Sequence, residues 1–417
     1  MGATAVLAAA VLLLVAGCWD RSLLARLDPV VGGWVAAVAG WPIVAIYVVA
    51  PLLWSDASAA GSLFTVLLYT PAVGYGLVQA GRALMRQRIV VDPAAAVLAS
   101  LFVSAGAAML IDGSGKLVNL VVAAAMYAGL VLRARSISLA AIGDAARIVL
   151  VGAVVALLAA VLVNPAEILG DCRADKCTEL GAALTSPFAG NGNLAGIMVT
   201  VLLPLAAYRA APARVVAAVL GVAAVGLLAG SRTAFIGIGV AAVGSLLLSA
   251  APRSRPRAVA LGGLFTGAAV LSFLPLYVGY AETDFSLRGY LWNQARALIP
   301  DQLVFGHDPA YWVDSGRSTL FVANYSPHNG WFEIVVSTGL WGAVVVVAAA
   351  VIKSRSVGPA ERPWLVAYFA TILSISSLEA VFVPYFLGIA PFAAILPFLV
   401  YRMPAERSAA EHPKESV

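Results

Sequence analysis

The chain has 417 residues, of which 62% are hydrophobic and only 11% are charged. Soluble globular domains are about 45–50% apolar and about 25% charged, so this composition excludes a surface that faces only water. The 26 basic and 21 acidic residues leave a net charge of +5. The basic residues stand in short clusters between apolar runs, which indicates membrane topology and not nucleic-acid binding.

The apolar runs are long enough to cross a bilayer as helices. Ala258–Val278, for example, contains no charged residue. The sequence therefore predicts an all-α polytopic membrane protein with about 12–13 transmembrane helices and one integral membrane domain, residues 1–417. The predicted spans are 2–19, 35–54, 61–80, 94–111, 117–132, 148–164, 193–208, 214–229, 233–250, 258–278, 332–352, 364–382 and 385–401.

Lysine and arginine are divided unevenly between the two sets of loops that these spans create. Nineteen of the 26 basic residues fall on the side that includes residues 402–417, and the remaining seven fall on the other side. Positive charge is retained on the cytoplasmic side of a membrane. We therefore expect residues 402–417 to form a cytoplasmic tail and the opposite set of loops to face outward.

The outward side has the two long loops, at 164–192 and 279–331, and the second of them precedes the last three predicted spans. Cys172 and Cys177 lie in the first loop, on the oxidising side of the membrane, where a disulfide is permitted. The sequence leaves a bridge and two free thiols open. In either case we expect the role of this pair to be structural.

The first outward motif is Gly230–Ala234. Ser231 is a predicted N-cap, and Arg232 falls in the first turn of the helix that follows. A helix N-terminus beside a guanidinium forms an anion-binding site. The alternative interpretation is an interfacial arginine that reaches the lipid head groups.

The second motif is Asp284–Arg296, in the second outer loop. Ser286 is predicted to cap a short amphipathic helix that places Arg288, Trp292 and Arg296 on one face, four residues apart. Trp292 suits the lipid interface or stacking on a sugar. The alternative is an interfacial loop helix whose arginines are solvated.

The third motif, Ser326–Glu333, leads into the predicted span 332–352. Ser326 followed by Pro327 is typical of an N-cap before the first helical position, which would place His328 in the first turn. The positive end of the helix dipole disfavours an imidazolium, and a general base has to be neutral to accept a proton. A lone histidine is more often structural, so this motif alone leaves both interpretations open.

Together the motifs place two helix N-termini, two or three arginines and a histidine on one side of the membrane. This combination predicts a phosphate-bearing substrate at the outer leaflet, bound next to a potential base. Asp301, Asp308 and Asp314 are scattered and form no paired acidic motif. We therefore expect a reaction that uses no metal and no cofactor.

In these residues the chain resembles the O-antigen ligase and polymerase superfamily of bacterial membrane glycosyltransferases. In that family, as here, a long outer loop precedes the last three spans. The matching segments are Pro187–Ala195, Ser231–Ala234, Leu287–Trp292, Gly306–Asp308 with Ala310–Trp312, His328–Trp331 and Gly339–Gly342.

The resemblance implies inverting, metal-independent transfer of a glycan from undecaprenyl pyrophosphate at the outer face of the bacterial inner (cytoplasmic) membrane. By position, Arg232 and Arg288 would hold the pyrophosphate, and His328 would take the proton of the acceptor hydroxyl. Further candidates for the site are Asn193, Trp292, Arg296, Arg317 and Asn329.

The resemblance leaves the acceptor open. A ligase moves the finished chain to a lipid A–core sugar, whereas a polymerase moves it to another repeat unit, with a chain-length regulator as a candidate partner. The pair Tyr311 and Trp312 is closer to the exopolysaccharide-polymerase branch. Family ligases have 12 spans with both ends inside, and the thirteen spans predicted here depart from that pattern.

A lipid or solute transporter is the alternative from another functional class. Transporters are expected to show inverted repeats and ionisable residues near the middle of the membrane. Only Glu379 lies clearly within a predicted span, near its outer end, and the sequence shows no internal repeat. The sequence therefore favours the enzyme.

Overall fold

The computed structural model describes residues 2–86, 89–111, 117–133, 135–171, 182–189, 192–250, 254–314, 326–383 and 395–401. Within these residues, seven helices are long and apolar enough to cross a membrane. They are Pro29–Leu53, α7 (Ser62–Met85), α8 (Pro93–Ile111), α10 (Leu139–Val163), α14 (Arg232–Ala250), α15 (Arg255–Tyr277) and α18 (Gly330–Ser356).

Shorter helices complete the bundle. They are α1 (Gly2–Cys18), α9 (Leu117–Val131), α12 (Asn193–Ala206), α13 (Pro212–Leu228) and α19 (Arg362–Ser376), with single turns at α2 (Leu23–Arg26), α6 (Ala57–Ala60) and α11 (Pro165–Ile168). This architecture confirms the predicted all-α polytopic membrane fold.

Each predicted span from 2–19 to 364–382 coincides with a helix, although the helix of the span 364–382 ends at Ser376 and residues 377–382 form a turn. The helix expected at 148–164 begins earlier, at Leu139, because the Ser138 hydroxyl caps it by accepting a hydrogen bond from Ala141 N at 3.2 Å. The last predicted span, 385–401, is not an α-helix where the structure describes it. Leu396–Leu399 forms one 3₁₀ turn. The number of crossings therefore stays a prediction, and residues 402–417 lie outside the described residues.

The second span is continuous but irregular. Pro29–Leu53 runs through α3 (Pro29–Val35), α4 (Trp41–Val44) and α5 (Ala50–Leu53), which are joined by two π-helical segments. Each π segment precedes a proline, Pro42 or Pro51. A proline ring clashes with the carbonyl one turn back, and a wider π turn is one way to accommodate it.

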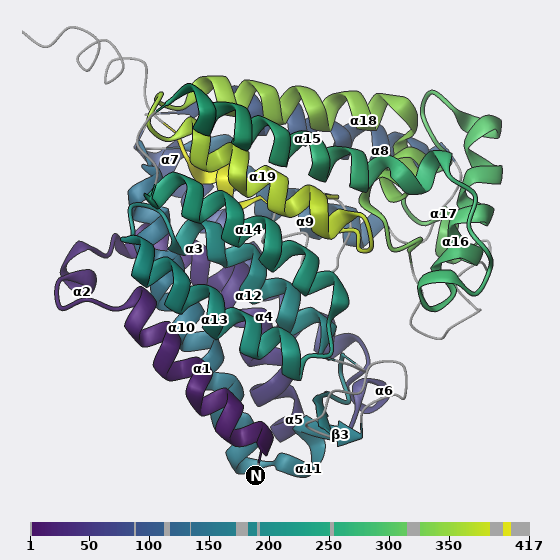
Figure 1. Ribbon diagram of the computed structural model, residues 1–417. Helices are drawn as coiled ribbons and strands as arrows, with labels where there is room; N and C mark the ends of the chain where they lie inside the picture. Colours follow the sequence, from purple (N-terminus) through teal and green to yellow (C-terminus); the bar gives the residue numbers. More distant parts are fainter. Residues whose placement is uncertain are drawn as a thin grey trace, which may run out of the picture.

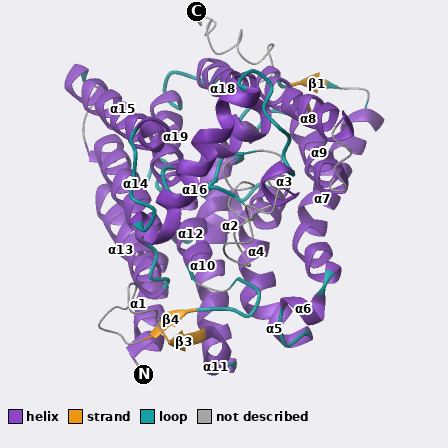
Figure 2. Ribbon diagram, turned by 90° about the vertical axis from the view of Figure 1, so that its right-hand side faces the viewer, coloured by secondary structure: helices purple, strands orange, loops and turns teal. Residues whose placement is uncertain are grey.

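Two small antiparallel sheets mark opposite ends of the molecule (Figure 2). β1 (Val90–Val91) pairs with β2 (Leu132–Arg133) at one end. β3 (Leu169–Asp171) pairs with β4 (Ala182–Leu184) at the other end, beside the N-terminus. This division agrees with the predicted alternation of loops, because β1 and β2 fall in one predicted set and β3 and β4 in the other.

The centre of the bundle is α12. All of its residues from Ala195 to Ala206 are buried, as expected for a helix that is apolar on every side. It packs against α10, α13, α14 and α19. α15 and α18 run alongside α19, and α16 (Asp284–Leu298) and α17 (Tyr311–Asp314) gather at one end of α15 and α18 (Figure 1).

Candidate active site

Four segments that are distant in sequence meet at one end of the bundle, on the side of β4. They are the N-termini of α12 and α14, the segment that precedes α18, and the turn that follows α19. Arg288 of α16 also reaches this place, where it binds the turn that follows α19. The predicted motifs on separate helices therefore belong to one place.

Glu379, in the turn after α19, is the residue that connects these segments. Its Oε1 accepts hydrogen bonds from Arg288 Nη2 at 2.6 Å and from Asn193 Nδ2 at 2.8 Å. Its Oε2 lies 2.9 Å from His328 Nδ1. Asn193 in turn accepts a hydrogen bond from the Ser231 hydroxyl. Three of the predicted site residues therefore share one carboxylate.

The charge of Glu379 follows from these contacts. The Arg288 guanidinium forms an ion pair with this carboxyl at 2.6 Å, an interaction made by the ionised form. An ionised carboxylate can only accept hydrogen bonds. His328 Nδ1 is therefore the donor in this contact, and in a neutral imidazole Nε2 is then the nitrogen able to take a proton.

His328 is held by a turn and not by the first turn of a helix. Its backbone has φ +50°, and its N–H donates to the Ser326 hydroxyl at 3.1 Å. The N-cap of α18 is Asn329, whose Oδ1 accepts from Trp331 N and Phe332 N. The prediction that Ser326 caps this helix is therefore wrong, because the asparagine three residues later takes that position.

Asn329 itself is fully buried. Besides capping α18, its Nδ2 donates to the carbonyls of Ser272 in α15 and Ser377 at the end of α19, at 3.1 and 3.2 Å. It joins three helix ends directly beside His328. These contacts describe a structural junction that sets where His328 lies.

The first motif is built as its sequence predicts. The Ser231 hydroxyl accepts a hydrogen bond from Ala234 N at 3.1 Å, so Ser231 caps α14, and Arg232 is the first helical residue. Arg232 is exposed, whereas Ser231 is buried. Because Ser231 also bonds Asn193, the N-terminus of α14 is tied to the group formed by Glu379, Asn193, Arg288 and His328, the Glu379 cluster.

The second motif forms α16, but not with the predicted cap. Phe285, Ser286 and Leu287 have left-handed backbone conformations, so Ser286 lies in a kink and does not cap the helix. The kink sets the position of Arg288, whose Nη1 donates to Phe285 O at 3.2 Å and whose Nε donates to Leu378 O at 3.1 Å. Three of its five N–H groups are used in this way, including the bond to Glu379.

Trp292 and Arg296 bind elsewhere. The buried Trp292 donates from Nε1 to Pro327 O at 3.0 Å, which braces the turn before His328. Arg296 donates to the carbonyls of Pro275, Leu276 and Val278, at the C-terminal end of α15. A cation that binds the last carbonyls of a helix stabilises its end.

Residues 215–347 match a protein-family model described as O-antigen ligase. This chain is a membrane protein with an O-antigen ligase domain. No curated protein matches it. The ligase domain contains Arg232, Arg288 and His328, whereas Asn193 and Glu379 lie outside the matched residues.

Two glycines of the ligase domain explain the segments around Gly306 and Gly339. Both have positive φ, +72° and +65°. A Cβ on Gly306 would lie 2.5 Å from Gly339 N, and one on Gly339 would lie 2.3 Å from Val304 O. Gly339 interrupts the helical conformation of α18. The chain before Gly306 packs against this break, where Leu340 N donates to Leu303 O at 2.9 Å.

The two residues after Gly306 complete this docking. His307 stacks on Tyr311 with ring centroids 4.2 Å apart, and its Nε2 lies 3.1 Å from Leu298 O. Asp308 accepts from the N–H groups of Ala310 and Tyr311 and thereby begins α17. The ligase domain therefore uses these residues to hold α16 and α17 against α18.

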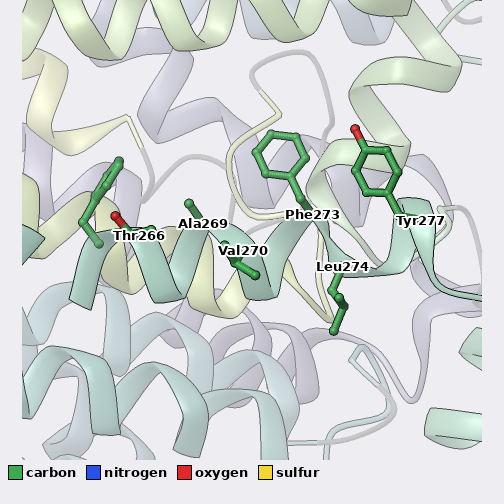
Figure 3. Close-up of a pocket in the computed structure, with 7 residues that line it drawn as sticks. Thr266, Ala269, Val270, Phe273, Leu274 and Tyr277 are labelled. Carbon is green, nitrogen blue, oxygen red and sulfur yellow. The ribbon is translucent and has the colours of Figure 1, made fainter. Parts of the chain in front are cut away.

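An apolar pocket of about 370 Å³ lies on α15 of the ligase domain (Figure 3). Phe273 and Tyr277, one turn apart, point to the same side of the helix. Phe273 stacks on Trp331 with ring centroids 4.1 Å apart. Trp331 is the second residue of α18 and follows His328 by three positions, so this side of α15 packs against the start of α18.

Several predicted residues lie outside the described residues: Cys172, Cys177 and Arg317. Their roles stay predictions. Within the described residues, no group of three or more His, Cys, Asp and Glu side chains is placed to hold a metal ion. Glu379 is the functional candidate that the sequence analysis did not assign, although an acid near the outer end of an apolar run is an unusual feature.

Proposed function

We propose that this protein transfers a glycan from undecaprenyl pyrophosphate to an acceptor hydroxyl at the outer leaflet of the bacterial inner membrane. The O-antigen ligase domain gives the reaction type, ligase or polymerase. The observation that supports the finer proposal is the shared contact of His328 and Arg288 with Glu379, at 2.9 and 2.6 Å. A base beside a phosphate-binding cation is what this transfer requires.

In the proposed reaction the acceptor oxygen attacks the anomeric carbon of the donor sugar. The bond from that carbon to the pyrophosphate oxygen breaks as the new glycosidic bond forms, and the configuration is inverted. The acceptor proton passes to Nε2 of His328. General base catalysis of this kind contributes about 10²–10⁴-fold in rate.

Arg288 and Arg232 would stabilise the negative charge of the departing undecaprenyl pyrophosphate. Arg288 is already oriented by carbonyls on either side of it, so little reorganisation is needed when charge develops. Arg232 adds a second guanidinium at the N-terminus of α14, where the helix dipole also favours an anion. The donor pyrophosphate would then lie between α14 and α16.

The lipid part of the donor needs an apolar path that reaches this site. The pocket on α15 is lined by apolar and aromatic side chains such as Phe273, Leu274 and Tyr277. The stacking of Phe273 on Trp331, three residues after His328, supports binding of the first isoprene units there. The remaining chain would extend into the bilayer.

This proposal requires the Glu379 cluster to face the periplasm or outside and residues 402–417 to be cytoplasmic, as the distribution of basic residues predicts. The acceptor would be either a lipid A–core sugar or another repeat unit. A chain-length regulator would be a partner in the second case.

The deciding experiment measures the length of polyprenyl-linked glycan that accumulates in cells lacking this protein. Long chains on the carrier would show a ligase, because polymerisation continues while transfer fails. Single repeat units would show a polymerase. An unchanged pool would contradict the glycosyltransferase proposal. Cells carrying the wild-type gene on a plasmid provide the control.

A further inference from the structure

Glu379 contacts both the proposed pyrophosphate-binding arginine, Arg288, and the proposed base, His328. Neither the sequence motifs nor the matched residues 215–347 include it. Its Oε1 faces Arg288 and Asn193, whereas its Oε2 faces His328. The Arg288, His328 and Glu379 side chains are 16%, 21% and 16% exposed. Charges that are largely withdrawn from water in this way interact more strongly than surface charges.

We infer that Glu379 is a positioning residue that couples the donor-binding arginine to the acceptor base, an inference that rests on the proposed function. The first part of this role is orientation. The Oε2 contact fixes which nitrogen of His328 carries the hydrogen and turns Nε2 away from the carboxylate. The turn from Ser326 to Asn329 fixes the backbone on which the ring stands.

The second part of the role is electrostatic. Before the donor binds, Glu379 balances the charge of Arg288 across a 2.6 Å ion pair. A bound pyrophosphate brings its own negative charge to Arg288 and shares that guanidinium with Glu379. The Glu379 carboxylate also lies 2.9 Å from His328 Nδ1, where it can stabilise the imidazolium that forms when Nε2 takes the acceptor proton.

The contacts of Glu379 also fix the path of the proton. The proton moves from the acceptor hydroxyl to His328 Nε2, and Glu379 stays ionised throughout. Asn193 keeps the carboxylate in place by its 2.8 Å bond to Oε1 and by its bond to Ser231, the cap of the helix that begins with Arg232. Both arginine-bearing elements are thus mechanically joined to the residue that orients the base.

Glu379→Gln in the full-length protein tests this inference, because it removes the charge and keeps the size. The donor is the lipid-linked glycan isolated from the deletion strain, and the binding probe is undecaprenyl pyrophosphate in lipid nanodiscs. We expect kcat to fall about 10- to 100-fold. We expect the probe to bind at least as tightly as to wild type, since Arg288 no longer shares its charge with a carboxylate. The exposed Glu282, in the loop between α15 and α16, provides the control variant Glu282→Gln.

A loss of kcat together with an equal loss of probe affinity would show a merely structural role and overturn the inference, as would a wild-type kcat. If Glu379→Gln does not fold, Glu379→Asp replaces it. That variant keeps the charge and lengthens the distance to His328, so we expect wild-type probe affinity with a reduced kcat, and a wild-type kcat would again overturn the inference. A wild-type protein that transfers no glycan and binds no probe would instead contradict the proposed function.

Discussion

His328 Nδ1 lies 2.9 Å from Glu379 Oε2, although 51 residues separate them in the chain. The contact exists because α18 and α19 run in opposite directions, so the start of one and the end of the other lie on the same side of the bundle. Asn329 secures this arrangement by bonding Ser377 O directly after α19. The position of the candidate base is therefore set by buried hydrogen bonds between helix ends.

Replacing His328 by alanine tests the base assignment. We expect transfer to fall by about 10²–10⁴-fold, because no base is left to take the proton of the acceptor hydroxyl. Protein level and binding of undecaprenyl pyrophosphate should stay close to wild type, since the arginines remain. The measurement is glycan transfer by purified protein in lipid.

His307→Ala is the matched control, because His307 bonds a backbone carbonyl and stacks on Tyr311, away from Glu379. His307→Ala loosens the docking of α17 but leaves the Glu379–His328 contact intact, so its kcat should fall far less than that of His328→Ala. Near-normal transfer by His328→Ala would contradict the assignment of His328 as the base.

Replacing Arg288 by lysine separates geometry from charge. Arg288 reaches Leu378 O, Phe285 O and Glu379 with three different nitrogens, which a single ammonium cannot reproduce. We expect Arg288→Lys to lose about 100-fold in kcat, nearly as much as Arg288→Ala. The exposed Arg255, at the other end of α15, gives the control Arg255→Lys. Full rescue by lysine would show that charge alone is sufficient.

The helices of this fold are predictable from sequence because each depends on its own apolar run and local breakers. The residues that cap these helices are harder to predict from sequence. Ser231 caps α14 as predicted, since a single candidate stands before that run. Ser326 and Asn329 are both good cap residues, and the sequence does not decide between them. Asn329 takes the cap because its amide group also satisfies two carbonyls of neighbouring helices.

The candidate site is predictable only in part. Asn193, Arg288 and His328 stand in motifs, and the structure brings all three onto Glu379. Glu379 has no motif around it, and its importance arises from contacts across the bundle. Arg296 shows the opposite case. Its spacing from Arg288 suggests a shared role, but it binds the carbonyl end of α15, a partner that no local pattern indicates.

Metal chelation tests the proposed reliance on arginines. If Arg232 and Arg288 neutralise the leaving pyrophosphate, EDTA should change the rate of glycan transfer by less than about twofold relative to the untreated protein. The assay is transfer by protein purified in chelator-treated buffers. Loss of activity that a divalent ion restores would contradict a metal-independent reaction.

Replacing Gly339 by alanine tests the docking of the outer loop on α18. The backbone there has φ +65° and ψ −166°, a conformation essentially restricted to glycine that costs about 1–3 kcal/mol in other residues. The new Cβ would also meet Val304 O at 2.3 Å. We expect a lower melting temperature and less protein in the membrane. Gly267→Ala is the control, because nothing lies within 4 Å of its added Cβ in α15, and alanine there should be neutral or slightly stabilising. Equal stability of the two variants would show that the segment before Gly306 does not press against the break in α18.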